Sequence, residues 1–94
     1  MLEKFQNELT DNLFEAILKL ENLEECYQFF EDVCTIKEVQ DLAQRLEVAK
    51  RLKEKMPYNE IAKLTGASTA TISRVNKCLS YGSGGYELIL DRLK

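Results

Sequence analysis

The hydrophobic positions of this chain recur every three or four residues, which is the spacing of one face of an α-helix. From Leu2 to Leu23 that spacing predicts a first helix, whose apolar face is wider than one neighbouring helix would cover. The apolar residues at helical spacing are Leu2, Phe5, Leu9, Leu13, Ile17 and Leu20. Because alternation of period two never persists, no strand is predicted and the fold class is all-α.

Polar residues mark where the next helices should begin. Asn22 with Glu25 three residues later is typical of an N-cap, and predicts a short second helix up to about Val33. Thr35 followed by Glu38 forms a capping box, and predicts the start of a central helix over residues 35–56 that Pro57 ends. The glycine-rich residues 81–85 predict a loop, and residues 86–94 predict a last helix.

Residues 57–78 have the pattern of a helix-turn-helix. Two short helices that cross closely need a small residue at the crossing, which is Ala62, and Gly66 four residues later supplies the positive φ of the turn. Ser68 is the expected N-cap of the second short helix. An apolar seam between the two helices is predicted from Ile61, Leu64, Ile72 and Val75. The alternative is a packing motif with no further role.

The other residues of the second short helix are expected to face outward, and their types suit double-stranded DNA. Small side chains and short hydroxyls let a helix approach base edges and thymine methyls in the major groove. Lysine and arginine neutralise phosphates. The candidate DNA-binding residues are Asn59, Lys63, Ser68, Thr69, Ala70, Thr71, Ser73, Arg74 and Lys77.

The charge of the chain is divided along its length. The net charge of -3 separates into -8 over residues 1–43, +5 over residues 44–77 and zero over residues 78–94. An acidic half joined to a basic half is expected when one face of a protein meets a polyanion. With 94 residues the chain forms one domain, residues 1–94, that gains stability from a second subunit, and we assign residues 1–34 to dimerisation.

Catalytic and metal chemistry find little support in the sequence. There is no histidine, and Cys26, Cys34 and Cys78 form no C-x-x-C pair, so we expect no metal and interpret the cysteines as reduced, small buried hydrophobes. The glycine run at 82–85 lacks the lysine of a P-loop, and no nucleophile and base come together, so neither a cofactor nor enzyme activity is expected. No apolar stretch is long enough for a membrane and no signal peptide is visible, which predicts a cytoplasmic protein.

The segment Gly-Ala-Ser-Thr-Ala-Thr-Ile-Ser-Arg, residues 66–74, resembles the Trp repressor family, and within it the YerC/YecD-like branch. The likeness has firm motifs over about residues 35–77. What it implies is a six-helix, all-α domain that forms an intertwined homodimer, with two helix-turn-helix elements entering successive major grooves. It also implies the function of a transcriptional regulator of the Trp repressor type.

The resemblance further implies a ligand site, in which an indole lies between two arginines that Arg45 and Arg74 match. Thr35 matches the helix start near the amino group of that ligand. The chain departs from the family where Val75 replaces a glycine and Cys78 replaces a serine. Because a branched side chain in that space should clash with a bound indole, we predict that tryptophan does not bind, and leave another small-molecule effector open.

Two functions from different classes therefore follow. The first is a sequence-specific, DNA-binding transcriptional regulator that does not respond to tryptophan. The alternative is a protein-interaction adaptor that retains the fold and binds a partner protein through its acidic N-terminal helices. The regulated genes, the operator sequence and the direction of regulation are not encoded in any motif that we identify.

Overall fold

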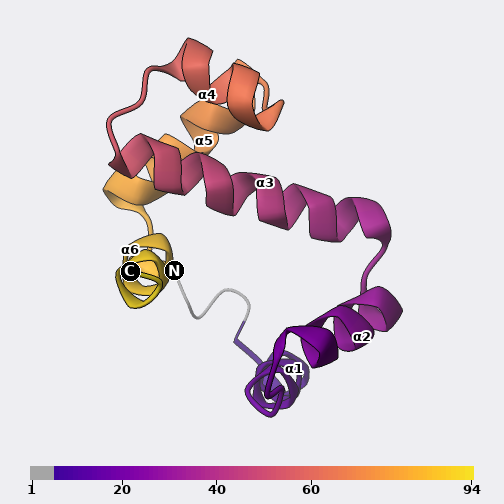
Figure 1. The fold of residues 1–94 in the computed structure, drawn as a ribbon. Helices are drawn as coiled ribbons and strands as arrows, with labels where there is room; N and C mark the ends of the chain where they lie inside the picture. Colours follow the sequence, from indigo (N-terminus) through magenta and orange to yellow (C-terminus); the bar gives the residue numbers. More distant parts are fainter. Residues whose placement is uncertain (1–5) are drawn as a thin grey trace. The chain divides into compact units, whose positions relative to one another are not determined.

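The computed structural model describes residues 6–94 and consists there of six α-helices without a strand (Figure 1). The all-α prediction is therefore confirmed. The chain divides into two compact units, residues 1–36 and residues 37–94. The helices are α1 (Glu8–Ile17), α2 (Leu23–Val33), α3 (Ile36–Lys53), α4 (Tyr58–Thr65), α5 (Thr69–Tyr81) and α6 (Gly85–Arg92).

The first unit contains α1 and α2, and the prediction of one helix from Leu2 to Leu23 is wrong in its bounds. Asn7 caps α1, because its Oδ1 accepts a hydrogen bond from the Thr10 amide at 2.9 Å. The helix ends at Ile17 in a turn that leads to Asn22. Leu20 lies in this turn and is half-buried, which explains why the apolar spacing continues past the end of the helix. Leu2 and Phe5 lie outside the described residues.

The predicted N-cap of α2 is confirmed. Asn22 Oδ1 accepts a hydrogen bond from the Glu25 amide at 2.9 Å, and the Glu25 carboxylate accepts one from the Glu21 amide at 2.9 Å. Phe29 and Phe30 pack edge to face with their ring centroids 5.5 Å apart. None of the described residues of α1 and α2 is fully buried. The large apolar side chains exposed in this unit are Leu9, Leu13, Phe14, Leu18, Leu23, Tyr27, Val33 and Ile36.

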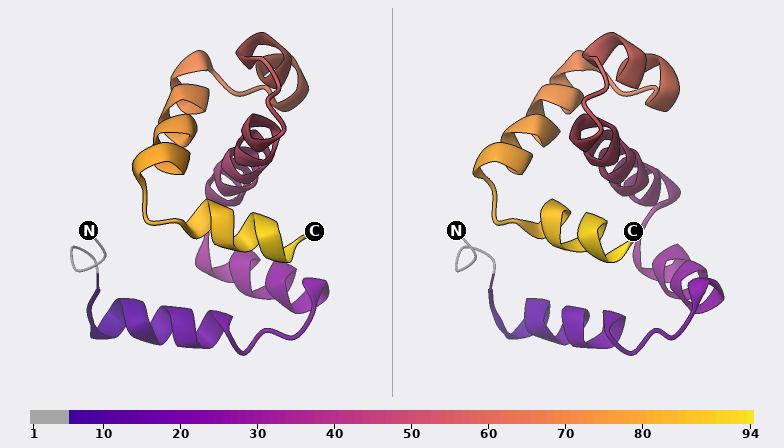
Figure 2. Two further views of the ribbon diagram at one scale, coloured as in Figure 1. Left: turned by 90° about the vertical axis from the view of Figure 1, so that its left-hand side faces the viewer. Right: turned by 60° about the vertical axis from the view of Figure 1, so that its left-hand side comes forward.

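The second unit packs α4, α5 and α6 on the carboxyl-terminal half of α3 (Figures 1 and 2). Each of the four helices contributes to one apolar core, with Ala67 of the α4–α5 turn also buried. Its members are Val48, Ala49, Ile61, Ala67, Ile72, Val75 and Leu90. Burying apolar surface is the main favourable term in folding, so this cluster holds the unit together.

The predicted seam between the two short helices is confirmed at three positions and wrong at the fourth. Ile61 and Ile72 are completely buried and Val75 is nearly so, but Leu64 is 55% exposed. The buried side of α4 continues from Ile61 to Thr65, one turn later, whose hydroxyl donates to the Ile61 carbonyl at 2.8 Å. Leu64 lies beside that face.

The boundaries of the later helices differ from the predicted ones by up to three residues. Ile36 begins α3 directly after Thr35, as the capping box predicted, but the helix ends at Lys53, where Lys55 adopts a φ of 66°. Helix α5 continues past residue 78 and ends at Tyr81. The next residue, Gly82, caps it, and an added Cβ there would clash with the Cys78 carbonyl oxygen. Because α6 already begins at Gly85, the glycine loop is shorter than predicted.

Charged side chains add a link between α3 and α6. Lys53 Nζ lies 3.0 Å from a Glu87 carboxylate oxygen and 3.9 Å from one of Asp91. The hydrogen bond that Lys53 donates to Glu87 raises the pKa of Lys53 above its ordinary value. Together with the buried Leu90, this pairing fixes α6 to α3.

Among the described residues, no helix combines the length and the apolar character needed to cross a membrane.

The turn between α4 and α5 generates a prediction about stability. Gly66 has a φ of 75°, as expected, and its amide donates to the Ala62 carbonyl at 2.8 Å. A Cβ at Gly66 would meet its nearest atom, Gln44 Nε2, at 3.9 Å, so Gly66→Ala should lose about 1–2 kcal/mol of unfolding free energy through backbone strain alone. Urea denaturation followed by circular dichroism measures this loss.

Gly85→Ala is the matched control, because Gly85 lacks a positive φ and a Cβ there meets open space. We expect its unfolding free energy to stay within about 0.5 kcal/mol of the wild-type value or to rise. Equal losses in the two variants would contradict a specific need for glycine at residue 66.

Candidate nucleic-acid interface

Helix α5 has one buried face and one exposed face. Ile72 and Val75 enter the core, and Leu79 one turn later is half-buried. The predicted outward residues of α5 that are exposed are Thr69, Ala70, Ser73, Arg74 and Lys77. Their spacing of three and four residues brings small side chains, hydroxyls and cations together along one surface of a single helix. We call α5 the recognition helix.

The first turn of the recognition helix is fixed by its cap. The Thr71 amide donates to Ser68 Oγ at 3.1 Å, which confirms the predicted N-cap, and the Ser68 hydroxyl donates to Thr71 Oγ1 at 3.1 Å. Thr71 is half-buried rather than outward, because its hydroxyl lies against the cap. The exposed hydroxyls of this helix near its start are therefore those of Thr69 and Ser73.

Helix α4 adds two of the predicted residues on its exposed side. Asn59 and Lys63 are one turn apart, and both are exposed. They lie away from Ile61, which packs in the core. An amide and an ammonium group at this spacing suit contacts with neighbouring phosphates of one DNA strand.

The cations of the second unit fall into two groups. Guanidinium nitrogens of Arg51 lie 2.6 Å from a Glu47 carboxylate oxygen and 3.1 Å from one of Glu54. The hydrogen bonds that Arg51 donates to these carboxylates raise its pKa, and the bond to Glu47 has the larger effect. Arg51 and Lys53 therefore already have intramolecular partners. In residues 6–94, no ion pair involves the exposed cations Lys63, Arg74 and Lys77. They are free to meet phosphates.

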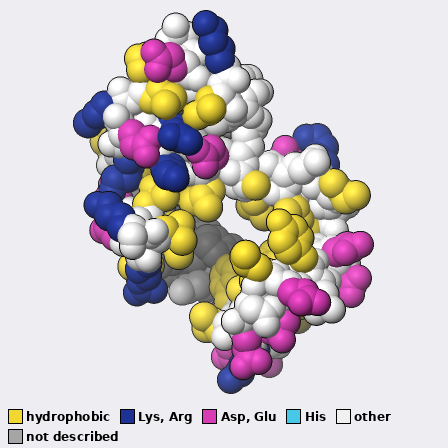
Figure 3. Space-filling view, in the orientation of Figure 1, with side chains coloured by type: hydrophobic (Ala, Val, Ile, Leu, Met, Phe, Trp, Pro, Cys, Tyr) yellow, Lys and Arg dark blue, Asp and Glu magenta, His cyan; other side chains and the backbone are white. Residues whose placement is uncertain are grey.

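The surface shows the same division of charge that the sequence indicated. Lys and Arg side chains gather over the second unit, whereas Asp and Glu gather over α1 and α2 (Figure 3). Yellow apolar side chains also reach the surface on α1 and α2.

Sequence reasoning missed Gln44, which touches the turn before the recognition helix. Its Nε2 donates a hydrogen bond to the Thr65 carbonyl at 3.2 Å, and its side chain is partly buried. The signal in the sequence was its position on α3, one turn before the core residue Val48. A polar side chain on the buried face of a helix requires a hydrogen-bond partner.

The residues expected to form a ligand pocket lie on different elements of the fold. Arg45 is half-buried on α3, Arg74 and Cys78 are exposed on α5, and Val75 is in the core. Thr35 is exposed and belongs to the first unit. Cys26 and Cys34 are half-buried, so the expectation that the three cysteines act as buried hydrophobes is wrong for Cys78 and only partly met by the others.

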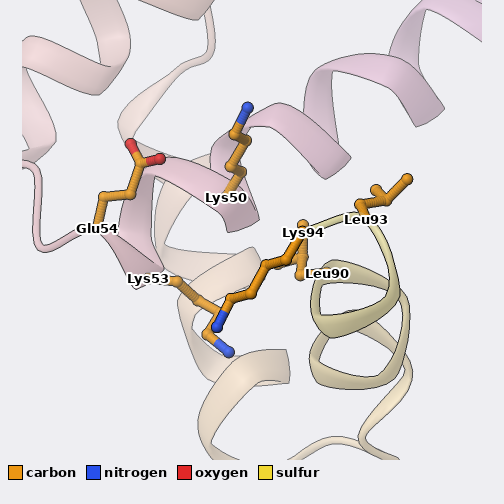
Figure 4. A pocket seen from close by; sticks show the side chains of 6 residues that line it. All are labelled: Lys50, Lys53, Glu54, Leu90, Leu93 and Lys94. Atoms are coloured by element: carbon orange, nitrogen blue, oxygen red, sulfur yellow. The ribbon is translucent and has the colours of Figure 1, made fainter.

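Two of the hollows formed by described residues of the second unit are lined without Arg45 or Arg74. One, of about 410 Å³, lies between α3 and α6 (Figure 4), and another of about 400 Å³ lies beside α4. The first is lined by Lys50, Lys53, Glu54, Leu90, Leu93 and Lys94. The second is lined by Met56, Glu60, Lys63 and Leu64.

The arrangement of α4, the Gly66 turn and the capped α5 defines a helix-turn-helix protein. The family model described as Trp repressor protein matches residues 8–94. The chain therefore belongs to the Trp repressor family, which is a regulator family rather than an enzyme family.

Relatives place the chain in the YerC-like branch of that family. It is 57% identical over 93 residues to the uncharacterized protein YerC of Bacillus subtilis (strain 168), covering 99% of this chain and 89% of YerC. A crystal structure of a candidate Trp repressor from Staphylococcus aureus is 54% identical with a TM-score of 0.95, over 99% of this chain and 93% of that one. A TrpR-like protein from Eubacterium eligens ATCC 27750 is 55% identical with a TM-score of 0.94, over 97% and 94%.

Proposed function

We propose that this protein is a sequence-specific, DNA-binding transcriptional regulator that reads the major groove with α5. The observation that carries the proposal is the exposed face of α5, where Thr69, Ala70 and Ser73 lie near the start of the helix and Arg74 and Lys77 follow. Membership of the Trp repressor family supports the same function.

Each part of this face has a role in the proposed complex. The methyl group of Ala70 and the hydroxyls of Thr69 and Ser73 suit base edges and thymine methyls at close range. Lys63, Arg74 and Lys77, with Asn59, suit the phosphates on either side of the groove. The buried Ile72 and Val75 hold the helix against the core while its opposite face meets DNA.

The proposal includes a homodimer formed through the N-terminal helices. The exposed apolar side chains of α1 and α2, together with Leu88 and Ile89 of α6 and Leu93 directly after it, are more than a monomer usually leaves in water. A second copy of the chain would cover them and would present two recognition helices to DNA. A protein-interaction adaptor would use the same acidic and apolar surface of α1 and α2 to bind its partner. Measurements of the oligomeric state and of the affinity for DNA therefore distinguish the DNA-binding regulator from the adaptor.

The first prediction concerns the residues assigned to phosphates. Arg74→Ala and Lys77→Ala should each weaken binding to duplex DNA and reduce the slope of log affinity against log salt by about one for each phosphate that is no longer neutralised. Gel-shift titrations at several salt concentrations measure both quantities. Lys19→Ala removes the same charge from an exposed position between α1 and α2 and should leave the slope unchanged. An identical slope in all three variants would contradict the assignment.

The second prediction concerns sequence preference. Combined substitution Thr69→Val and Ala70→Ser should change which duplexes the protein selects from a random-sequence library, because good base contacts discriminate by about 1–3 kcal/mol. Sequencing of the selected duplexes gives the preference. Ser80→Ala, at an exposed position near the other end of α5, serves as the control. If the double variant kept both affinity and preference, α5 would not be the recognition helix.

The third prediction concerns assembly. Sedimentation equilibrium of the wild-type protein should give twice the chain mass of 10.9 kDa. Phe14→Asp should shift the monomer–dimer equilibrium toward monomer, because it places a charge in the apolar surface of α1. Gln28→Asp, on the exposed side of α2, should not. A chain that is monomeric at all concentrations, and that binds DNA with little salt dependence, would favour the adaptor.

The fourth prediction concerns tryptophan. Because Val75 is 1% exposed and fills core space on the back of α5, calorimetric titration with L-tryptophan should give no saturable heat. Tight, stoichiometric binding of tryptophan would refute this part of the proposal.

A further inference from the structure

Gln44 connects α3 to the helix-turn-helix, which we call the recognition element and define as residues 58–81. Its amide nitrogen reaches the carbonyl of Thr65, the last residue of α4, at 3.2 Å. The final carbonyls of a helix have no partner inside that helix, so the bond satisfies a group that would otherwise need water. The same amide nitrogen lies 3.9 Å from the Cβ position of Gly66, directly over the turn that leads to α5.

The turn itself is fastened by bonds that stay within the recognition element. The Thr65 hydroxyl donates to the Ile61 carbonyl at 2.8 Å and accepts from the Ala67 amide at 3.2 Å. The Gly66 amide donates to the Ala62 carbonyl at 2.8 Å. These bonds fix the shape of the turn but do not fix its orientation on α3.

Orientation depends on the contacts that cross from α3. Val48 and Ala49 supply apolar contacts with Ile61, Ile72 and Val75, and such contacts tolerate small rotations because the hydrophobic effect has no preferred direction. A hydrogen bond weakens steeply when its angle or length changes. The bond from Gln44 therefore restricts the rotation that apolar packing allows.

We propose that Gln44 is a positioning residue that holds the recognition element in its DNA-binding orientation without a small-molecule effector. Gln44 lies beside Gly66 at the turn, and the buried side chain of Val75 fills core space on the inner face of α5. A ligand that had to fasten the element to α3 would compete with both. The inference rests on the proposed function, since orientation matters for binding only if α5 reads DNA.

The first test compares Gln44→Met, which keeps the length of the side chain and loses its donor, with wild-type protein. The probes are a duplex that wild-type protein selects from a random library and a duplex of the same composition with scrambled sequence. Gln44→Met should lower affinity for the selected duplex about three- to tenfold, the range expected for one hydrogen bond, and leave affinity for the scrambled duplex and the salt slope unchanged. A purely structural role would lower the melting temperature without changing the affinity ratio in folded protein.

A matched pair of charged variants checks the geometry. Gln44→Glu replaces the donor by an acceptor that faces the Thr65 carbonyl, and should reduce the selected-to-scrambled affinity ratio at least as much as Gln44→Met. Gln40→Glu makes the same change of charge one turn earlier on α3, where the side chain is exposed, and should leave the ratio unchanged. Equal ratios in Gln44→Glu and Gln40→Glu would overturn the proposal.

Two further measurements separate this inference from the proposed function. In the first, wild-type protein is unfolded in guanidinium, dialysed to remove any bound small molecule, and refolded. It should then bind the selected duplex as tightly as before. If binding returned only after L-tryptophan or a small-molecule extract was added, the protein would need an effector and the inference would be overturned. Amide hydrogen exchange of residues 58–81 should be several-fold faster in Gln44→Met than in wild-type protein, with or without DNA. Unchanged exchange would refute the link from Gln44, and failure of wild-type protein to select any duplex would refute only the proposed function.

Discussion

The burial of three branched side chains, Ile61, Ile72 and Val75, against Val48 and Ala49 of α3 is the interaction on which the second unit depends. Without it α4 and α5 would be isolated helices of eight and thirteen residues, lengths that are marginal in water. Packing on α3 makes them stable and at the same time decides which residues of α5 remain outside. The surface that we assign to DNA is thus defined by the core on the other side of the same helix.

Among the described residues, some cations of the second unit have carboxylate partners and others do not. Arg51 and Lys53 of α3 have carboxylate partners, and Lys63, Arg74 and Lys77 of the recognition element do not form ion pairs within residues 6–94. The net charge of -3 therefore says little about the partner of this protein, because the acidic residues are concentrated in α1 and α2. A polyanion would experience the local field of the recognition element rather than the average over the chain.

Sequence reasoning succeeded where one residue has one local reason for its conformation. Asn22 and Ser68 cap helices, and Gly66 adopts a positive φ, because each satisfies a requirement set by its immediate neighbours. It failed where a longer-range contact decides. Leu64 fits the helical spacing but is displaced from the buried face by Thr65, and Cys78 is exposed because Val75 and Leu79 take the inner side of α5. The bond from Gln44 to Thr65 joins residues twenty-one positions apart and could not be read from either segment alone.

In the proposed complex, the width of the major groove limits how much of α5 can lie near base edges. Thirteen residues of α-helix measure about 20 Å, whereas the major groove is about 12 Å wide. A helix that enters the groove with its first two turns must therefore leave its last residues, up to Tyr81, outside over the sugar-phosphate backbone. Only the side chains between Thr69 and about Asn76 would then be near base edges, so one copy would distinguish only a few base pairs. In the proposed homodimer, a longer site would be composed of two such readings.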